Sequence, residues 1–195
     1  MLERQIRENN DYALWEDFRS GSESAFSKIY NDYVQELYRY GVRFNPETEI
    51  VKDNIQELFI KLYNNRANLN PTDNIRLYLL RSLKNRLINV YFDRKESVSL
   101  DELPFEILKT EDAEPGEDWD EIVKRKKLKK GIDSLTPRQR EAIYLRYTRE
   151  MTMAEMTELL DMNYQSVRNL LHRSIEKLRK EMLIVALLLL HLFID

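Results

Sequence analysis

Cysteine is absent from this chain of 195 residues, which contains only two histidines, four glycines and five prolines. Without thiols there is no disulfide framework and no cysteine-ligated metal site, which suits a reducing cytosol. The few glycines form no glycine-rich phosphate loop and leave little material for tight β-hairpins. The acidic residues also lack organised catalytic partners, so we expect neither an enzyme, nor a cofactor, nor a metal site.

Long apolar runs are scarce as well. The first residues, MLERQIRENNDY, contain no signal-peptide core. Residues 182–190, MLIVALLLL, are apolar throughout, but a bilayer span needs about twenty such residues. We therefore expect a cytoplasmic protein with no stable membrane span. Three interpretations of the tail, residues 183–195, stay open: packing on the chain's own domains, burial in a second copy or a partner, and membrane contact.

The net charge of −3 is distributed unevenly along the chain. Residues 1–95 hold 15 basic and 14 acidic residues, residues 96–123 hold one and eleven, and residues 124–195 hold 15 and nine. An acidic segment thus separates a near-neutral part from a basic part, and local basic patches attract phosphate. Because the acidic segment also contains Pro104 and Pro115, we interpret it as a linker with a few apolar residues able to dock.

Capping signals predict three consecutive helices in residues 134–181. Each start carries side chains that can satisfy unpaired backbone N–H groups. These are Thr136 with Gln139 for the first helix, Thr152 with Glu155 for the second, and Asn163 for the third. Pro137 occupies the first helical position, and only residues 160–163 separate the last two helices. Two short helices joined by so tight a turn are typical of a helix-turn-helix, which reads duplex DNA.

The third helix begins at Tyr164 and presents polar side chains near its start. Gln and Asn can pair with adenine edges, and Arg with guanine edges or phosphate. The candidate DNA-binding residues are Gln165, Ser166, Arg168, Asn169, His172 and Arg173. On an isolated helix they would more simply form a solvated face, but the turn and the capping boxes before them favour DNA.

Periodicity predicts a helical bundle over residues 8–95. Apolar residues recur every three or four positions in stripes that begin at Ala25, Ile50 and Ile75, and a short helix around Trp15 precedes them. We therefore expect an all-α protein with two small helical domains. The expected ranges are the bundle 8–95, the acidic linker 96–123, the helix-turn-helix domain 124–182 and the hydrophobic tail 183–195.

The helix of residues 75–94 combines cations with aromatic rings. This combination suits phosphate neutralisation and stacking on unpaired bases, although a lone helix would more simply bury the rings and solvate the cations. The residues are Arg76, Arg81, Lys84, Arg86 and Arg94 with Tyr78, Tyr91 and Phe92. The polar residues of the helix 47–63 indicate nothing beyond a solvated face when taken alone.

Together these segments resemble the extracytoplasmic-function (ECF) sigma factors of bacterial RNA polymerase, in the sigma-70 family, over residues 11–182. GSESAFSKIYNDYVQELYRYG is similar to the first helix of region 2, and VKDNIQELFIKLY to its polymerase-binding helix. NIRLYLLRSLKNRLINVYFDRK resembles the segment that engages the −10 element, and SLTPRQREAIYLRY with MTMAEMTELLDMNYQSVRNLLHRSIEKLRK resembles region 4. Asp161 replaces the usual turn glycine, and Asp tolerates left-handed backbone better than most residues.

The resemblance implies a non-enzymatic role in transcription initiation. Region 2 would bind the β′ clamp helices of core RNA polymerase and trap unstacked bases of promoter DNA. The implied polymerase-binding residues are Asp53, Gln56, Glu57 and Phe59, and the implied −10 residues are Arg76, Tyr78, Arg81, Lys84, Asn85 and Arg94. Region 4 would lie on the β flap and read the −35 element, the acidic linker would thread toward the RNA exit channel, and an anti-sigma factor would be a further partner.

Two other functions remain as alternatives. A two-domain helix-turn-helix regulator without a melting role would need a ligand or receiver domain, and the bundle shows neither a pocket pattern nor a phosphoacceptor pattern. A protein-interaction module anchored through the tail would fractionate in a detergent-dependent way.

Overall fold

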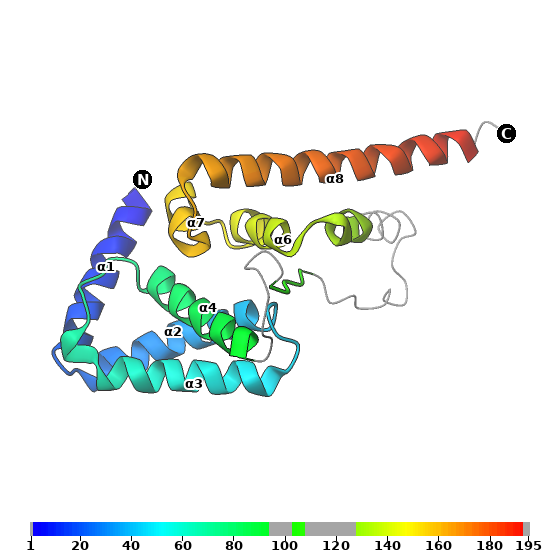
Figure 1. The fold of residues 1–195 in the computed structure, drawn as a ribbon. Coiled ribbons are helices and arrows are strands. Elements are labelled where there is room, and N and C mark those ends of the chain that lie inside the picture. The colour runs from blue at the N-terminus through cyan, green and yellow to red at the C-terminus, as the bar shows by residue number, and fades with distance from the viewer. Residues whose placement is uncertain (1, 94–102, 108–127, 193–195) are drawn as a thin grey trace, which may run out of the picture. The chain divides into compact units, whose positions relative to one another are not determined.

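The computed structural model describes residues 2–93, 103–107 and 128–192, and among them the side chains of residues 10–92, 103–107 and 128–180. Within these residues there are helices and turns but no strand, and the all-α prediction is confirmed (Figure 1). The elements are α1 (Leu2–Arg19), α2 (Glu23–Gly41), α3 (Thr48–Asn64), the 3-10 turn η1 (Arg66–Asn68), α4 (Ile75–Asp93), α6 (Pro137–Ile143), the π turn η3 (Tyr144–Thr148), α7 (Met153–Leu160) and α8 (Tyr164–Leu192).

The chain forms two compact units, Met1–Val98 and Ser99–Asp195. Most of the expected linker lies outside the described residues, so the finer domain boundaries stay a prediction. None of the helices within the described part of the chain is long and apolar enough to cross a membrane.

In the N-terminal unit, α2, α3 and α4 pack against one another and α1 packs across α2. The predicted apolar stripes form the core, where Leu37, Val51 and Leu83 are buried. α1 contributes Trp15, which is fully buried and donates from Nε1 to the carbonyl oxygen of Asn70 over 2.9 Å. Its ring contacts Tyr78 edge-on, with the ring centroids 5.0 Å apart. α1 is thus part of the bundle and longer than the short helix expected.

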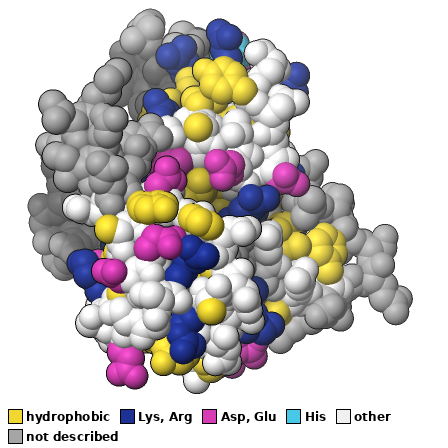
Figure 2. Space-filling model, turned by 90° about the vertical axis from the view of Figure 1, so that its left-hand side faces the viewer, with side chains coloured by type: hydrophobic (Ala, Val, Ile, Leu, Met, Phe, Trp, Pro, Cys, Tyr) yellow, Lys and Arg dark blue, Asp and Glu magenta, His cyan; other side chains and the backbone are white. Residues whose placement is uncertain are grey.

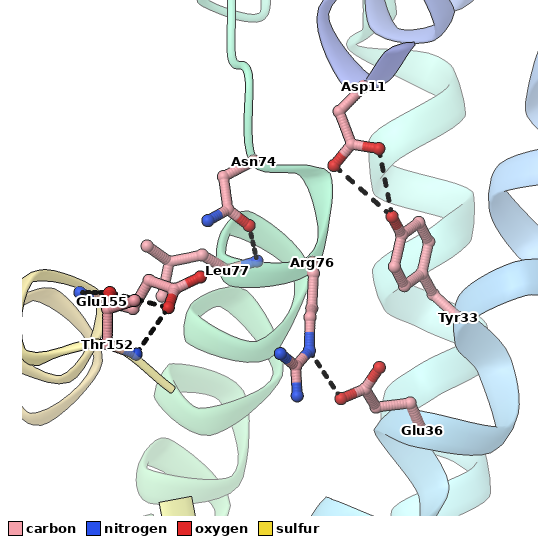
Figure 3. Close-up of polar contacts among 8 residues, drawn as sticks. All are labelled: Asp11, Tyr33, Glu36, Asn74, Arg76, Leu77, Thr152 and Glu155. Carbon is pink, nitrogen blue, oxygen red and sulfur yellow. Dashed lines mark hydrogen bonds and ion pairs between the residues drawn. The ribbon is translucent and has the colours of Figure 1, made fainter. Parts of the chain in front are cut away.

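Side chains from three segments fix the start of α4 (Figure 3). Asn74 accepts a hydrogen bond from the backbone N–H of Leu77 over 2.9 Å, which is an N-cap. Asp11 of α1, which is buried, accepts from the N–H of Ile75 over 3.2 Å and from the Tyr33 hydroxyl over 3.4 Å. The carboxylate also lies where the helix dipole favours negative charge. The orientation of α4 therefore depends on α1 as well as on its own sequence.

The C-terminal unit confirms the predicted capping chemistry. Both capping boxes are present, at Thr136 and at Thr152, and Asn163 accepts from the N–H of Ser166 over 2.8 Å. Asp161 has φ 52° and ψ 52°, so the turn has the left-handed residue expected there. The predicted helix-turn-helix is therefore formed, with α7 and α8 as its two helices.

Three features of this unit did not follow from periodicity. The helix after α6 widens into the π turn η3, which the apolar pattern does not signal. α8 continues to Leu192, so the apolar run forms the end of this helix, and its side chains lie outside those described. Phe105 of the acidic segment is 1% exposed and packs on Tyr144, so the expected docking of apolar linker residues does occur.

Candidate functional site

The start of α8 presents its polar residues on one solvent-facing side. Gln165, Arg168 and Asn169 are exposed and recur at helical spacing, while Val167 and Leu171 are buried against the rest of the unit. The rest of the predicted set, Ser166, His172 and Arg173, flanks or extends this side. Figure 2 shows basic side chains gathered beside exposed apolar ones over the start of α8. The geometry suits insertion of one helix face into a major groove.

Local contacts order several of these side chains. The Gln165 amide donates to the Asn169 amide oxygen over 3.0 Å, and His172 lies 3.4 Å from the carboxylate of Glu176. Arg138 of α6 donates to the carbonyl oxygen of Leu160 over 3.0 Å and thereby braces the turn that precedes α8. Rigid support of this kind holds a reading helix at a fixed angle to its unit.

The predicted −10 residues of α4 fall into two groups. Arg81 and Asn85 are exposed, one turn apart, and Tyr78 is half-buried. Burial raises the pKa of the Tyr78 hydroxyl, and a hydrogen bond with Ser82 partly opposes this shift. Arg94 lies outside the described residues. Among the described residues of this set, Arg81 and Asn85 are the exposed ones.

Arg76 and Lys84 are less accessible than the sequence led us to expect. The Nε of Arg76 donates to Glu36 of α2 over 2.7 Å, and both side chains are mostly buried (Figure 3). Lys84 is buried, and its Nζ lies 5.9 Å from the centre of the Phe44 ring. Its position fits the buried register of Leu80 and Leu87, which explains why this cation faces inward. Both cations attach α4 to its neighbours in this conformation.

A small pocket of about 280 Å³ opens between α3 and α4. Its polar lining combines a phenol, a hydroxyl, an amide and two cations with apolar side chains. The lining residues are Leu58, Lys61, Leu62, Asn65, Leu69, Tyr78, Ser82 and Arg86. A ring beside hydrogen-bonding groups is the chemistry that binds an unstacked base. Sequence periodicity did not reveal this pocket, because it depends on how two helices meet.

The predicted polymerase-binding residues lie along α3. Asp53, Gln56 and Glu57 are exposed on one side of the helix, whereas Phe59 is buried. Glu57 forms an ion pair with Arg86 of α4, so it also joins the two helices. Phe59 contacts the ring of Tyr30 with centroids 4.8 Å apart, so it supports this surface from beneath.

A larger apolar groove of about 870 Å³ lies between α2 and α3. Phe59 and Gln56 border it, and Tyr30 and Ile60 are 41% and 49% exposed along it. A contiguous exposed apolar surface of this kind is suited to binding another protein. The sequence of α3 alone did not indicate this groove, because it depends on how α2 and α3 pack.

Two family descriptions match the chain. "Sigma-70 region 2" matches residues 29–97, and "Sigma-70, region 4" matches residues 131–180. The RNA polymerase sigma factor YlaC of Bacillus subtilis (strain 168) is 26% identical over 156 residues, which cover 79% of this chain and 90% of that protein. The ECF RNA polymerase sigma factor SigW of the same organism is 24% identical over 177 residues, which cover 84% of this chain and 92% of that protein.

Solved structures share the fold. CnrH, in complex with the cytosolic domain of CnrY, matches with a TM-score of 0.59 at 20% identity, over 88% of this chain and 96% of that chain. The sigma factor RpoE from Bartonella quintana, in complex with the anti-sigma factor NepR, matches with a TM-score of 0.56 at 14% identity, over 80% of this chain and 96% of that chain. Sigma factors are regulatory, non-enzymatic proteins. With both regions in order along one helical chain, this protein belongs to the sigma-70 family and is an ECF sigma factor.

Proposed function

We propose that this sigma factor directs core RNA polymerase to specific promoters and helps to melt the −10 element. The pocket between α3 and α4 carries the melting proposal, because its ring and polar groups suit an unstacked base. Arg81 and Asn85 are exposed on the adjoining helix and can hold the phosphates and edges of the opened strand. Melting by this route needs no catalytic residue, since it replaces base stacking with protein contacts at about a few kcal/mol per base.

In region 4, the exposed side of α8 reads the −35 element and the same unit rests on the β flap. Gln165, Arg168 and Asn169 support this role, because their side chains are spaced for base edges in one major groove. Exposed Arg179 and Lys180 lie further along α8 and suit phosphate contacts.

The groove between α2 and α3 receives the β′ clamp helices of core polymerase. Its apolar floor and polar rim suit a helix that inserts an apolar side and pairs its flanks with Gln56 and Lys52. Because two solved relatives are complexes with CnrY and with the anti-sigma factor NepR, we also propose an anti-sigma factor as a partner of this chain.

Ile60→Glu should weaken core binding at least tenfold in a pull-down titration, while duplex binding by α8 is retained.

Transcription from duplex and from pre-melted templates separates melting from binding. The chain is combined with core polymerase, and run-off product is measured on a promoter duplex and on the same promoter with an open −10 bubble. Asn85→Ala should lower product severalfold on the duplex and much less on the bubble. Asn31→Ala removes an exposed amide from α2 and serves as the matched control.

Equal losses on both templates would show that Asn85 acts in binding alone. If the parent chain gives no core binding and no promoter-dependent product, the proposed function itself is wrong.

A further inference from the structure

Residues 103–107, LPFEI, pack within the C-terminal unit although they belong to an otherwise acidic stretch. Phe105 is 1% exposed, and its ring centroid lies 5.6 Å from that of Tyr144 at an interplanar angle of 56°. Leu103 is also buried. The carboxylate of Glu106 lies 3.6 Å from Nη1 of Arg140. A buried aromatic side chain and an ion pair therefore hold the same short segment in place.

The receiving surface lies on one side of α6 and of the π turn that follows it. Arg140 and Tyr144 are four residues apart, so their side chains lie above one another on the helix surface. A buried phenylalanine removes about 150–250 Å² of surface from water, whereas the ion pair, whose glutamate is mostly exposed, contributes little. Phe105 is thus the anchor of the contact, and Glu106 sets its register.

We infer that residues 103–107 form an intramolecular latch that shortens the tether between the two DNA-binding units. With the latch closed, ten residues run from Asp93, the end of α4, to Leu103, and can span at most about 36 Å. With the latch open, 35 residues run from Asp93 to Leu128, and can span up to about 126 Å. For a flexible chain, the root-mean-square reach grows about 1.9-fold on release.

The consequence for promoters rests on the proposed function. Two elements named −10 and −35 lie about 25 base pairs, or roughly 85 Å, apart along straight duplex DNA. A closed latch restricts how far the region 4 reader can move from the region 2 reader. An open latch allows the two units to separate far enough to bind both DNA elements at the same time. Residues 103–107 therefore hold the unassembled protein in its short-reach form.

Distance measurements on the full chain test the latch directly. The chain has no cysteine, so Ser27→Cys in α2 and Ala154→Cys in α7, both exposed positions, accept spin labels without background. The parent pair should give a distance distribution with a sharp upper limit. Phe105→Ala and replacement of residues 103–107 by GSGSG should both broaden it to longer distances, toward the 1.9-fold larger tether reach.

Glu106→Arg should broaden the distribution in part, and the double variant Glu106→Arg with Arg140→Glu should restore it. Glu111→Arg makes the same charge change elsewhere in the linker and should leave the distribution unchanged. Far-UV circular dichroism verifies that each variant keeps its helices. An unchanged distribution in folded Phe105→Ala and GSGSG chains would overturn the latch. Because neither polymerase nor DNA is present, this result is independent of the run-off experiment.

Discussion

Thr152 and Glu155 together accept hydrogen bonds from backbone N–H groups at the start of α7. Its hydroxyl oxygen accepts from the Glu155 N–H over 3.3 Å, and the Glu155 carboxylate accepts from the Thr152 N–H over 2.8 Å. Thr152→Ala should therefore lower the free energy of unfolding of the C-terminal unit by about 1 kcal/mol. Urea denaturation followed by circular dichroism measures this loss.

Thr157 offers a matched control within the same helix. Its hydroxyl donates back to the carbonyl oxygen of Ala154 over 2.6 Å, a contact that gives a helix interior little stability. Thr157→Ala should change stability by only a few tenths of a kcal/mol. Equal losses in the two variants would mean that the cap contributes nothing specific.

Tyr78 should make stability fall at alkaline pH. Its pKa is raised by burial in the folded chain, so the folded state keeps this proton longer than the unfolded state does. The contribution to stability is complete below the unfolded pKa of about 10, and it is lost as pH rises through the folded pKa. Tyr78→Phe cannot ionise, so its unfolding free energy should decline less between pH 9 and pH 11.

Chemical denaturation across this pH range, with absorbance at 295 nm to follow tyrosinate, measures the difference. Tyr12→Phe is the control, because it removes a hydroxyl from a tyrosine of the same unit that is 49% exposed. An alkaline profile of Tyr78→Phe that matches the parent would show that this phenol does not contribute.

At the scale of an element, the exposed side of α8 makes a separable prediction. Arg168→Ala should weaken binding to a −35 duplex by about 1–3 kcal/mol, if the guanidinium pairs with a base edge. Association with core polymerase should be unchanged. Arg179→Ala, further along the helix, should instead cause a smaller loss that is similar for all sequences. Fluorescence anisotropy with duplex and with core measures both; a fall in core association for Arg168→Ala would contradict the assigned face.

Element starts were predictable because local chemistry decides them. Thr136, Thr152 and Asn163 cap the helices that they were expected to cap, since each cap involves residues only three positions apart. The inward position of Lys84 was not predicted, although it continues the register of the buried Leu80 and Leu87. The charge of its side chain suggested a DNA contact, but the register of α4 places it in the core.

Features that depend on two elements meeting were not predictable. The groove between α2 and α3 and the pocket between α3 and α4 arise from helix packing, which one sequence does not specify. The cap that Asp11 provides for Ile75 joins residues 64 positions apart, so no local pattern announces it. The π turn at Tyr144 changes the hydrogen-bonding pattern of the helix backbone, and no distinctive residue pattern predicts it.

For the whole molecule, the acidic linker should weaken non-specific binding to DNA. Residues 96–123 carry eleven acidic residues and one basic residue, which oppose the basic C-terminal part in attracting phosphate. Neutralising the seven acids between residues 111 and 121 with Gln and Asn should raise affinity for random duplex severalfold at about 50 mM salt. The affinities of the parent chain and of the neutralised variant should become similar near 300 mM salt, where screening is stronger. Anisotropy at both salt concentrations is the measurement, and a gain that does not depend on salt would exclude this electrostatic cause.

The hydrogen bond between Asp11 and the first turn of α4 has a consequence for the choice of expression fragments. The region 2 match begins at residue 29, so a fragment cut at that point would lack α1 altogether. Such a fragment would leave the Ile75 N–H without its carboxylate partner and would remove Trp15 from the core. The start of the region 2 match is therefore not a folding boundary, and an expression fragment of this unit has to include Asp11 and Trp15.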